Sequence, residues 1–280
     1  MKTISKPPRD AAADYDRCID NTKDEADREA LRQARRVTIP LFQEYEAGSW
    51  HFDRLSDLSG LSQVQRKALL KTYGLTQKRR PLSDLRAELI LNAEGECPYC
   101  RLENPTTLDH FLPKSKFEPY ASLYSNLIPM CNICNTLKGT KGSPTAHQFF
   151  THAYFDEIAA GVRLLIAQVS VGSRQIATNF SPDFSCDLDE SILQRLSYQF
   201  SMLRLGQRYQ LAAIDVIKET AEIISGMHND GASSQSIREL LSSNASDAMG
   251  NLGAGHWRAL LLEALSQNVA FHVAGFKLVL

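Results

Sequence analysis

The chain has 280 residues, of which 43% are hydrophobic and 22% are charged, and its formal net charge is −1. This length allows one or two domains with a sizeable core, and the near-zero charge means that any nucleic-acid contact would depend on locally concentrated positive charge. No apolar run approaches the roughly 18 residues of a membrane helix, and the N-terminus has no apolar core typical of a secretory signal. We therefore expect a cytoplasmic protein without a membrane segment.

The first third of the chain is predicted to be helical. Residues 9–36 are rich in charged and helix-forming residues and contain no Gly or Pro, which favours an exposed helix. Two further helical segments are expected over 37–50 and 55–73. A shorter helix is expected over Ser83–Leu91, with Ser83 as its N-cap after Pro81.

Two C-x-x-C pairs, Cys97/Cys100 and Cys131/Cys134, lie in a segment that is rich in Pro, Asn and Lys and has no simple periodicity. In a chain without a signal peptide, such pairs indicate metal binding or redox chemistry before disulfides. Redox chemistry at one pair would not explain the second pair. We therefore predict that four thiolates hold a structural Zn²⁺ in a closed tetrahedral shell.

The remainder is predicted to be a β-hairpin followed by helices. Residues 162–171 and 174–180 alternate in polarity around Gly172-Ser173, which is typical of a hairpin. Helical spacing recurs over 191–226, 234–250 and 255–268. The expected fold class is α+β, with mainly helical regions around a central zinc-stapled module. The expected domains are 1–92 (helical), 93–150 (the module) and 151–280 (the hairpin and C-terminal helices).

Three further features follow in a fixed order within the cysteine frame: Asp109-His110, Asn126 and Asn135-x-x-Lys138. Together with the cysteines, they resemble the HNH (ββα-metal) endonuclease family, in the subset where two cysteine pairs bracket the active centre. The resemblance covers only residues 97–142. It implies a β-hairpin followed by a helix, with a catalytic divalent metal held between them.

The chemistry of phosphodiester hydrolysis suggests a role for each residue. His110 is the candidate general base, because an imidazole titrates near neutral pH. Asp109, expected on the opposite face of the strand, is the candidate carboxylate ligand for Mg²⁺ or Mn²⁺. Asn135 resembles the second metal ligand, although the family name has His there, and an all-oxygen shell favours Mg²⁺ or Mn²⁺ over zinc.

The remaining residues have supporting roles or simpler alternatives. By the resemblance, Asn126 would fix the loop and orient His110. Lys138 could offer positive charge near the phosphate, or it could be an ordinary exposed lysine. Lys114, Lys116 and Lys141 add to the local positive charge. His147 and His152, close to several aromatic residues, are expected to be packing residues.

A stretch without acidic residues precedes the module. Between Leu58 and Ser83 the only charged residues are basic: Arg66, Lys67, Lys71, Lys78, Arg79 and Arg80. The simplest interpretation is a solvated helix face followed by a charged turn. Beside a nuclease centre, the same stretch favours an arm that contacts phosphates.

The predicted activity is hydrolysis of double-stranded DNA, giving a nick or a double-strand break with 5′-phosphate ends. Helical regions around an HNH module resemble effector nucleases of bacterial restriction and anti-phage defence, Septu-type effectors among them, which work beside an ATPase or sensor subunit. One alternative is a non-catalytic zinc module that binds nucleic acid or a partner protein, with Asp109 and His110 incidental. Another is an RNA-cutting toxin, since no residue that would read a 2′-hydroxyl can be identified.

Overall fold

The computed structural model describes residues 1–49, 60–141, 149–159 and 161–280. By their contacts, these residues form two compact units. The N-terminal unit comprises Thr3–Tyr99 and Glu103–Glu157, and the C-terminal unit comprises Met1–Lys2, Cys100–Leu102 and Ile158–Leu280. The division into domains 1–92, 93–150 and 151–280 stays a prediction. Two of the expected helix ends, at Trp50 and Leu55, and also His147 lie outside the described residues.

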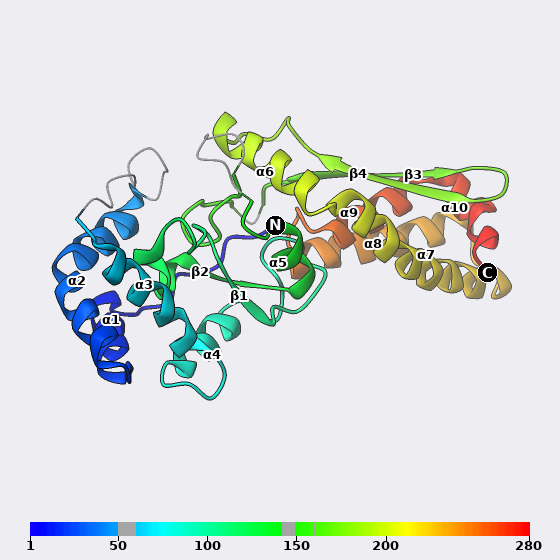
Figure 1. The fold of residues 1–280 in the computed structure, drawn as a ribbon. Helices are drawn as coiled ribbons and strands as arrows, with labels where there is room; N and C mark the ends of the chain where they lie inside the picture. The colour runs from blue at the N-terminus through cyan, green and yellow to red at the C-terminus, as the bar shows by residue number, and fades with distance from the viewer. Residues whose placement is uncertain (50–59, 142–148, 160) are drawn as a thin grey trace. The chain divides into compact units, whose positions relative to one another are not determined.

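Helices make up the first part of the N-terminal unit (Figure 1). They are α1 (Ala11–Asn21), α2 (Glu25–Glu44), the π-helical turn η1 (Tyr45–Ser49), α3 (Gln63–Thr72), the 3₁₀ turn η2 (Tyr73–Thr76) and α4 (Ser83–Leu91). The single helix expected over 9–36 is wrong in two respects. Thr22 is extended and Asp24 caps a new helix by accepting from Asp27 N–H, and that helix then continues past residue 36 to Glu44.

The starts of α3 and α4 differ in their capping. Ser62 and Gln65 form a reciprocal capping box at the start of α3, which satisfies two otherwise unpaired N–H groups. The bounds of α4 are those predicted, but Ser83 is its first helical residue. Its N-cap is Leu82, which makes no side-chain cap bond, so the predicted cap is wrong.

A small ββα arrangement completes the N-terminal unit. Strands β1 (Thr107–His110) and β2 (Leu127–Met130) pair antiparallel, with Asp109 opposite Ile128. The connection between them contains the 3₁₀ turns η3 (Glu118–Tyr120) and η4 (Tyr124–Asn126), and helix α5 (Asn132–Lys138) follows β2. Strand β2 is buried along its whole length, and α4 packs against both strands. The hairpin followed by a helix is the arrangement that the resemblance implied.

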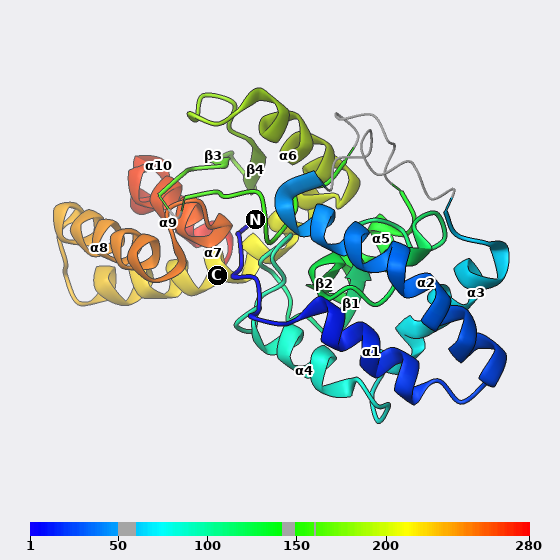
Figure 2. The ribbon, with the colours of Figure 1, turned by 90° about the vertical axis from the view of Figure 1, so that its left-hand side faces the viewer.

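The C-terminal unit contains a hairpin and helices (Figure 2). The predicted hairpin is present as β3 (Leu165–Val171) and β4 (Ile176–Pro182). The helices are α6 (Glu190–Met202), α7 (Leu205–Asn229), α8 (Ser234–Leu252), α9 (Trp257–Gln267) and α10 (Val269–Val273), followed by the 3₁₀ turn η5 (Gly275–Leu278). Helix α9 packs against β3 and α8, and α7 packs against β4. The segment predicted to be helical over 191–226 is helical but interrupted, because Arg204 adopts a left-handed conformation (φ 52°) that separates α6 from α7.

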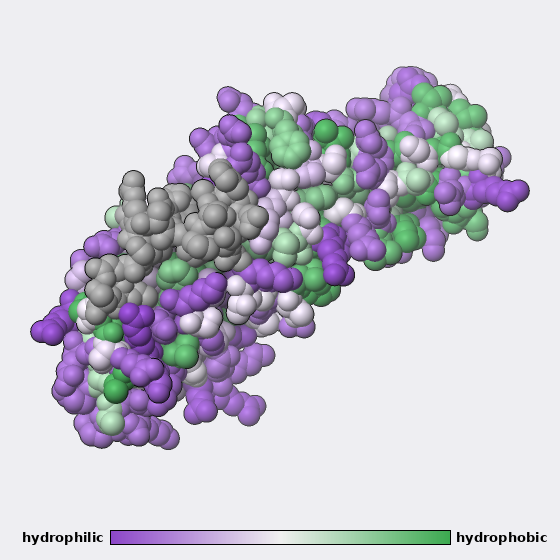
Figure 3. Space-filling view, turned by 45° about the horizontal axis from the view of Figure 1, so that its top comes forward, coloured by the Kyte–Doolittle hydropathy of each residue, from purple (hydrophilic) through white to green (hydrophobic). Residues whose placement is uncertain are grey.

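Helices with two small two-stranded sheets are compatible with the predicted α+β class. On the face that Figure 3 shows, hydrophobic residues lie in patches between hydrophilic ones. Within the described ranges, none of the helices combines the length and apolar composition needed to span a bilayer.

Candidate active site

The four predicted cysteines come together. Cys97, Cys100, Cys131 and Cys134 are buried, and their sulfur atoms all lie within 4.8 Å of one another. A tetrahedron with Zn–S bonds of about 2.3 Å has edges of about 3.8 Å, so the cluster fits a zinc ion with little adjustment. The backbone N–H of Cys134 donates to Cys131 Sγ over 3.4 Å, a contact that favours a thiolate. The cluster therefore suits a structural zinc.

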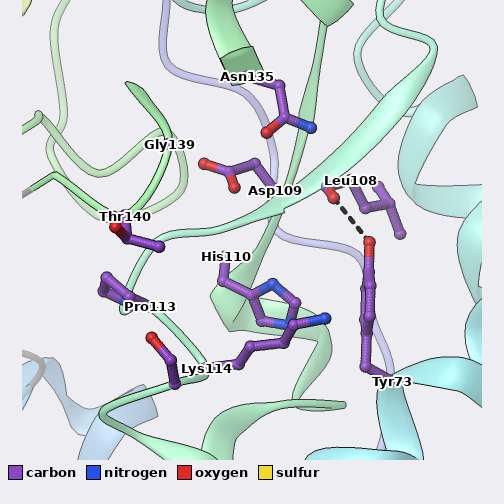
Figure 4. Close-up of a pocket in the computed structure, with 10 residues that line it drawn as sticks. Tyr73, Leu108, Asp109, His110, Pro113, Lys114, Asn135, Gly139 and Thr140 are labelled. Atoms are coloured by element: carbon purple, nitrogen blue, oxygen red, sulfur yellow. Dashed lines mark hydrogen bonds between the residues drawn. The ribbon is translucent and has the colours of Figure 1, made fainter. Parts of the chain in front are cut away.

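A pocket of about 330 Å³ is lined in part by residues of β1 and α5, which belong to the same segment of the chain as the cysteines (Figure 4). It brings together Asp109, His110 and Asn135, as predicted. Asn126 and Lys138 are not among the residues that line it. The full lining is Tyr73, Leu108, Asp109, His110, Pro113, Lys114, Ser115, Asn135, Gly139 and Thr140.

His110 ends β1 and is only 6% exposed. Its Nε2 lies 2.9 Å from the carbonyl oxygen of Ala121. Because a carbonyl can only accept, Nε2 carries the hydrogen, and the Nδ1 lone pair of the neutral ring is left to accept a proton. Burial, together with the positive charges of Lys114 and Lys138, lowers the pKa of His110 to about 3, although the hydrogen bond to Ala121 opposes this shift. The imidazole is therefore neutral at pH 7, the form that a general base requires.

Asp109 is paired inside the protein with Lys138. The Lys138 ammonium lies 2.6 Å from Asp109 Oδ2 and donates to the backbone oxygen of His110 over 2.7 Å. Burial raises the pKa of the Asp109 carboxyl, and the nearby ammonium opposes this shift. Because only 1% of the Lys138 side chain is exposed, the alternative of an ordinary surface lysine is wrong. Its charge is directed at the end of β1.

The orientation of the Asn135 amide follows from its hydrogen bonds. Its Nδ2 donates to the hydroxyl of Thr107 over 3.0 Å. That hydroxyl donates its only hydrogen to the carbonyl oxygen of Met130 over 2.8 Å, so it can only accept from Asn135. This turns Oδ1 of Asn135 toward the carboxylate of Asp109 (Figure 4). Two oxygen ligands of the kind that hard divalent cations prefer thus share one side of the pocket.

Asn126 is completely buried and holds the loop between the strands. Its Oδ1 accepts from the backbone N–H of Leu112 over 2.8 Å, and its Nδ2 donates to the carbonyls of Leu112 and Tyr120 over 3.2 and 3.0 Å. The next residue after Tyr120 is Ala121, whose carbonyl accepts from His110. Asn126 therefore contacts the loop that holds the imidazole, and within the described part of the chain its side chain makes no hydrogen bond to His110.

Behind Asn126 lies a pair of side chains that the sequence did not connect to the site. The Nδ1 atom of His152 accepts from the backbone N–H of Tyr154 over 3.2 Å, so the hydrogen of the neutral ring is on Nε2. That nitrogen lies 2.9 Å from the hydroxyl of Tyr45, which in turn donates to Asn126 Oδ1 over 3.1 Å. His152 is buried as expected, but it also supports the loop through Tyr45.

Tyr73 and Lys114 form a second wall of the pocket. The Tyr73 hydroxyl donates to the carbonyl of Leu108 over 2.9 Å, and its ring centroid lies 4.4 Å from that of His110. The Lys114 ammonium lies 4.0 Å from the centroid of the Tyr73 ring, and burial lowers its pKa. Lys114 thus supplies positive charge at the pocket wall, whereas Tyr73, which lies outside the motif, gave no signal in the sequence.

Residues 97–141 match the family model of the HNH endonuclease. No curated protein and no solved structure matched the chain. The matched segment contains all four cysteines and the three predicted site residues that line the pocket, Asp109, His110 and Asn135. An HNH endonuclease domain indicates nuclease activity on nucleic acid.

Proposed function

We propose that this protein is a metal-dependent endonuclease that hydrolyses DNA phosphodiester bonds in the pocket of His110, Asp109 and Asn135. The observation that carries the proposal is the combination of a neutral imidazole with two oxygen ligands, inside a segment that matches the HNH family model. The four cysteines would bind a structural zinc, which would stabilise the fold of this segment.

His110 would act as the general base. Its Nδ1 takes a proton from the water whose oxygen attacks phosphorus, while the bond from phosphorus to the 3′-oxygen breaks. The hydrogen bond from Nε2 to Ala121 holds the ring in the required tautomer and helps to stabilise the imidazolium that forms. A Mg²⁺ or Mn²⁺ ion held by Asp109 and Asn135 would neutralise charge on the phosphate and on the leaving oxygen.

Neighbouring residues would hold the general base and the metal ligands in position. Lys138 balances the charge of Asp109 without entering the pocket. Lys114, at the pocket wall, is better placed than Lys138 to contact the phosphate, and we assign the phosphate-neutralising role to it. Asn126 would hold the loop that positions His110.

The non-catalytic alternative explains less of the geometry. A zinc module that only binds DNA or a partner protein needs the cysteines, but it does not need a buried neutral histidine or an amide oriented toward a carboxylate. Such a module would bind DNA equally well after His110→Ala. An RNA-cutting toxin would use the same residues, so only the substrate distinguishes it.

The direct test is cleavage by the purified full-length protein of supercoiled plasmid and of an RNA of matched length, with Mg²⁺, Mn²⁺ or EDTA. We expect the plasmid to be nicked or linearised with 5′-phosphate ends when either cation is present and to stay intact in EDTA. Cleavage of RNA alone would replace the DNA assignment with the toxin. Binding of DNA without cleavage of either substrate would favour the non-catalytic module.

We further propose a role in bacterial restriction or anti-phage defence, beside an ATPase or sensor subunit. This extension rests on the helical regions around the HNH segment alone. It predicts that a tagged full-length chain expressed from its own locus co-purifies with an ATPase or sensor protein, and that deleting the gene increases sensitivity to phage. Unchanged sensitivity and purification as an isolated chain would contradict it.

A further inference from the structure

The basic stretch before the HNH segment separates into two groups. Arg66 lies 3.7 Å from Glu118 and Lys71 lies 2.6 Å from Asp27, so both form ion pairs with acidic residues of the same unit. Lys67, Lys78, Arg79 and Arg80 are exposed. Among the residues that the structure describes, none of these four forms an ion pair with an acidic side chain. Three of them are consecutive, in the turn between η2 and α4.

This turn, Lys78–Arg80, has a defined backbone. The N–H of Arg80 donates to Gln77 over 3.0 Å, that of Ser83 to Arg80 over 2.9 Å and that of Leu82 to Leu75 over 2.9 Å. In both ribbon views the turn projects from the lower edge of the N-terminal unit (Figures 1 and 2). The three cationic side chains are therefore exposed to solvent on a turn whose backbone is fixed by hydrogen bonds.

Arg79 occupies a position that favours glycine. Its φ is 62°, a left-handed conformation that costs a residue with a β-carbon more than it costs glycine. A strained residue at a surface turn suggests that its side chain has a use. Binding of an anionic partner by the cationic side chain at the tip of the turn would be such a use.

The turn is close to the pocket along the chain. Tyr73 lines the pocket, and Lys78 follows it by five residues. At no more than about 3.6 Å per residue, Lys78 lies within about 18 Å of Tyr73, and Arg80, which follows Tyr73 by seven residues, lies within about 25 Å of it. One DNA strand carries a phosphate about every 3.4 Å along the helix axis, so about five to seven phosphates span these distances.

We infer that the Lys78–Arg80 turn is a second phosphate-contacting surface, which binds the backbone of duplex DNA within about seven base pairs of the phosphate in the pocket. The inference rests on the proposed function, because it presumes a nucleic acid in that pocket. A partner that reaches both places must carry regularly spaced negative charge, which a polynucleotide has and a mononucleotide lacks. The turn would bind the DNA backbone without recognising the base sequence.

The test is the salt dependence of duplex binding in Ca²⁺, measured for the full chain and for the triple variant Lys78→Ala/Arg79→Ala/Arg80→Ala. Loss of three phosphate contacts should make the slope of log K against log salt shallower by about 2 to 3. The matched control removes three exposed cations of the C-terminal unit, Arg174→Ala/Lys218→Ala/Arg238→Ala. It should leave the slope within about 0.5 of wild type.

Cleavage kinetics distinguish a defect in DNA binding from a defect in the chemical step. At saturating duplex, the triple variant should cleave at nearly the wild-type kcat with a KM raised about tenfold or more. An unchanged slope and KM, or equal changes in the control variant, would overturn the inference while wild-type cleavage upheld the proposed function. If the wild-type chain neither binds nor cuts DNA, the proposed function itself fails.

Arg79→Gly provides an independent readout. If the side chain serves only the fold, its removal should lower the Tm, or leave both Tm and binding unchanged. If it contacts phosphate, glycine should keep or raise the Tm, because the strain is relieved, while the salt slope becomes shallower by about 1. A lowered Tm or an unchanged slope would count against the surface.

Discussion

The pKa of His110 makes the stability of the fold depend on pH. The folded protein keeps the imidazole neutral down to about pH 3, whereas the unfolded chain binds a proton near pH 6.5. The contribution of this group to stability is therefore fully present above pH 6.5 and is lost as the pH falls toward 3. From pH 7 to pH 5, wild type should lose about 2 kcal/mol more unfolding free energy than His110→Gln.

Urea denaturation of the two proteins at both pH values measures this difference. Because the other titrating groups are common to both, the variant isolates the contribution of His110. If the stability gap between wild type and variant does not change with pH, the imidazole is not held neutral by burial.

Thr107 should control how well the pocket holds a divalent cation. Its hydroxyl leaves the Asn135 amide only one orientation, with the oxygen toward Asp109. Thr107→Val keeps the shape but removes this constraint, and we expect about tenfold weaker Mn²⁺ binding by electron paramagnetic resonance, as for other residues that orient metal ligands. Thr107→Ser should bind Mn²⁺ like wild type. Equal affinities for the Val and Ser variants would contradict the role.

The buried pair of Lys138 and Asp109 gives a third prediction. Lys138→Met keeps most of the side-chain volume but leaves the carboxylate without its cation, which should destabilise the protein by about 3 kcal/mol. Adding Asp109→Asn should recover most of that loss, because no unpaired charge remains. Chemical denaturation of both single variants and the double variant measures the coupling. Strictly additive effects would show that the two charges do not interact.

At the scale of elements, the helices and strands that short-range sequence signals determine were the ones that could be predicted. The hairpin around Gly172-Ser173 and the bounds of α4 follow from short-range alternation, turn residues and helix signals. The interruption at Thr22–Asp24 was missed because the charged composition is helical on both sides, and only the Asp24 cap marks the new start. The break at Arg204 depends on a left-handed residue that is not glycine, for which the sequence offers no ordinary signal.

Helix α5 joins the cysteine cluster to the pocket. It has only seven residues, and its N-cap is Cys131, which accepts from the N–H of Cys134. A helix this short does not form alone in water, so the sulfur cluster and packing must hold it. Cys134→Ala should therefore lose zinc and, with it, Mn²⁺ binding at Asn135, as measured by metal analysis and electron paramagnetic resonance. Retention of full Mn²⁺ affinity without zinc would separate the two sites.

At the scale of the whole molecule, the sequence predicted the grouping of the candidate site residues better than it predicted the residues that support them. The cysteines, Asp109, His110 and Asn135 share a compact motif, and the structure brings them together as two neighbouring groups. Tyr45 lies 81 residues before Asn126, which it contacts, and nothing local marks either partner. Net charge was equally uninformative, because the 32 acidic residues of the chain offset its 31 Lys and Arg residues, among them those of the Lys78–Arg80 turn.

The measurement that tests the central claim most directly is the single-turnover rate of duplex cleavage by wild type and His110→Ala, with zinc content and DNA affinity measured in the same preparations. We expect the variant to keep its zinc and its affinity, and to cleave at least about 100-fold more slowly, because it has lost the general base. Cleavage at the wild-type rate would place the catalytic centre elsewhere in the chain.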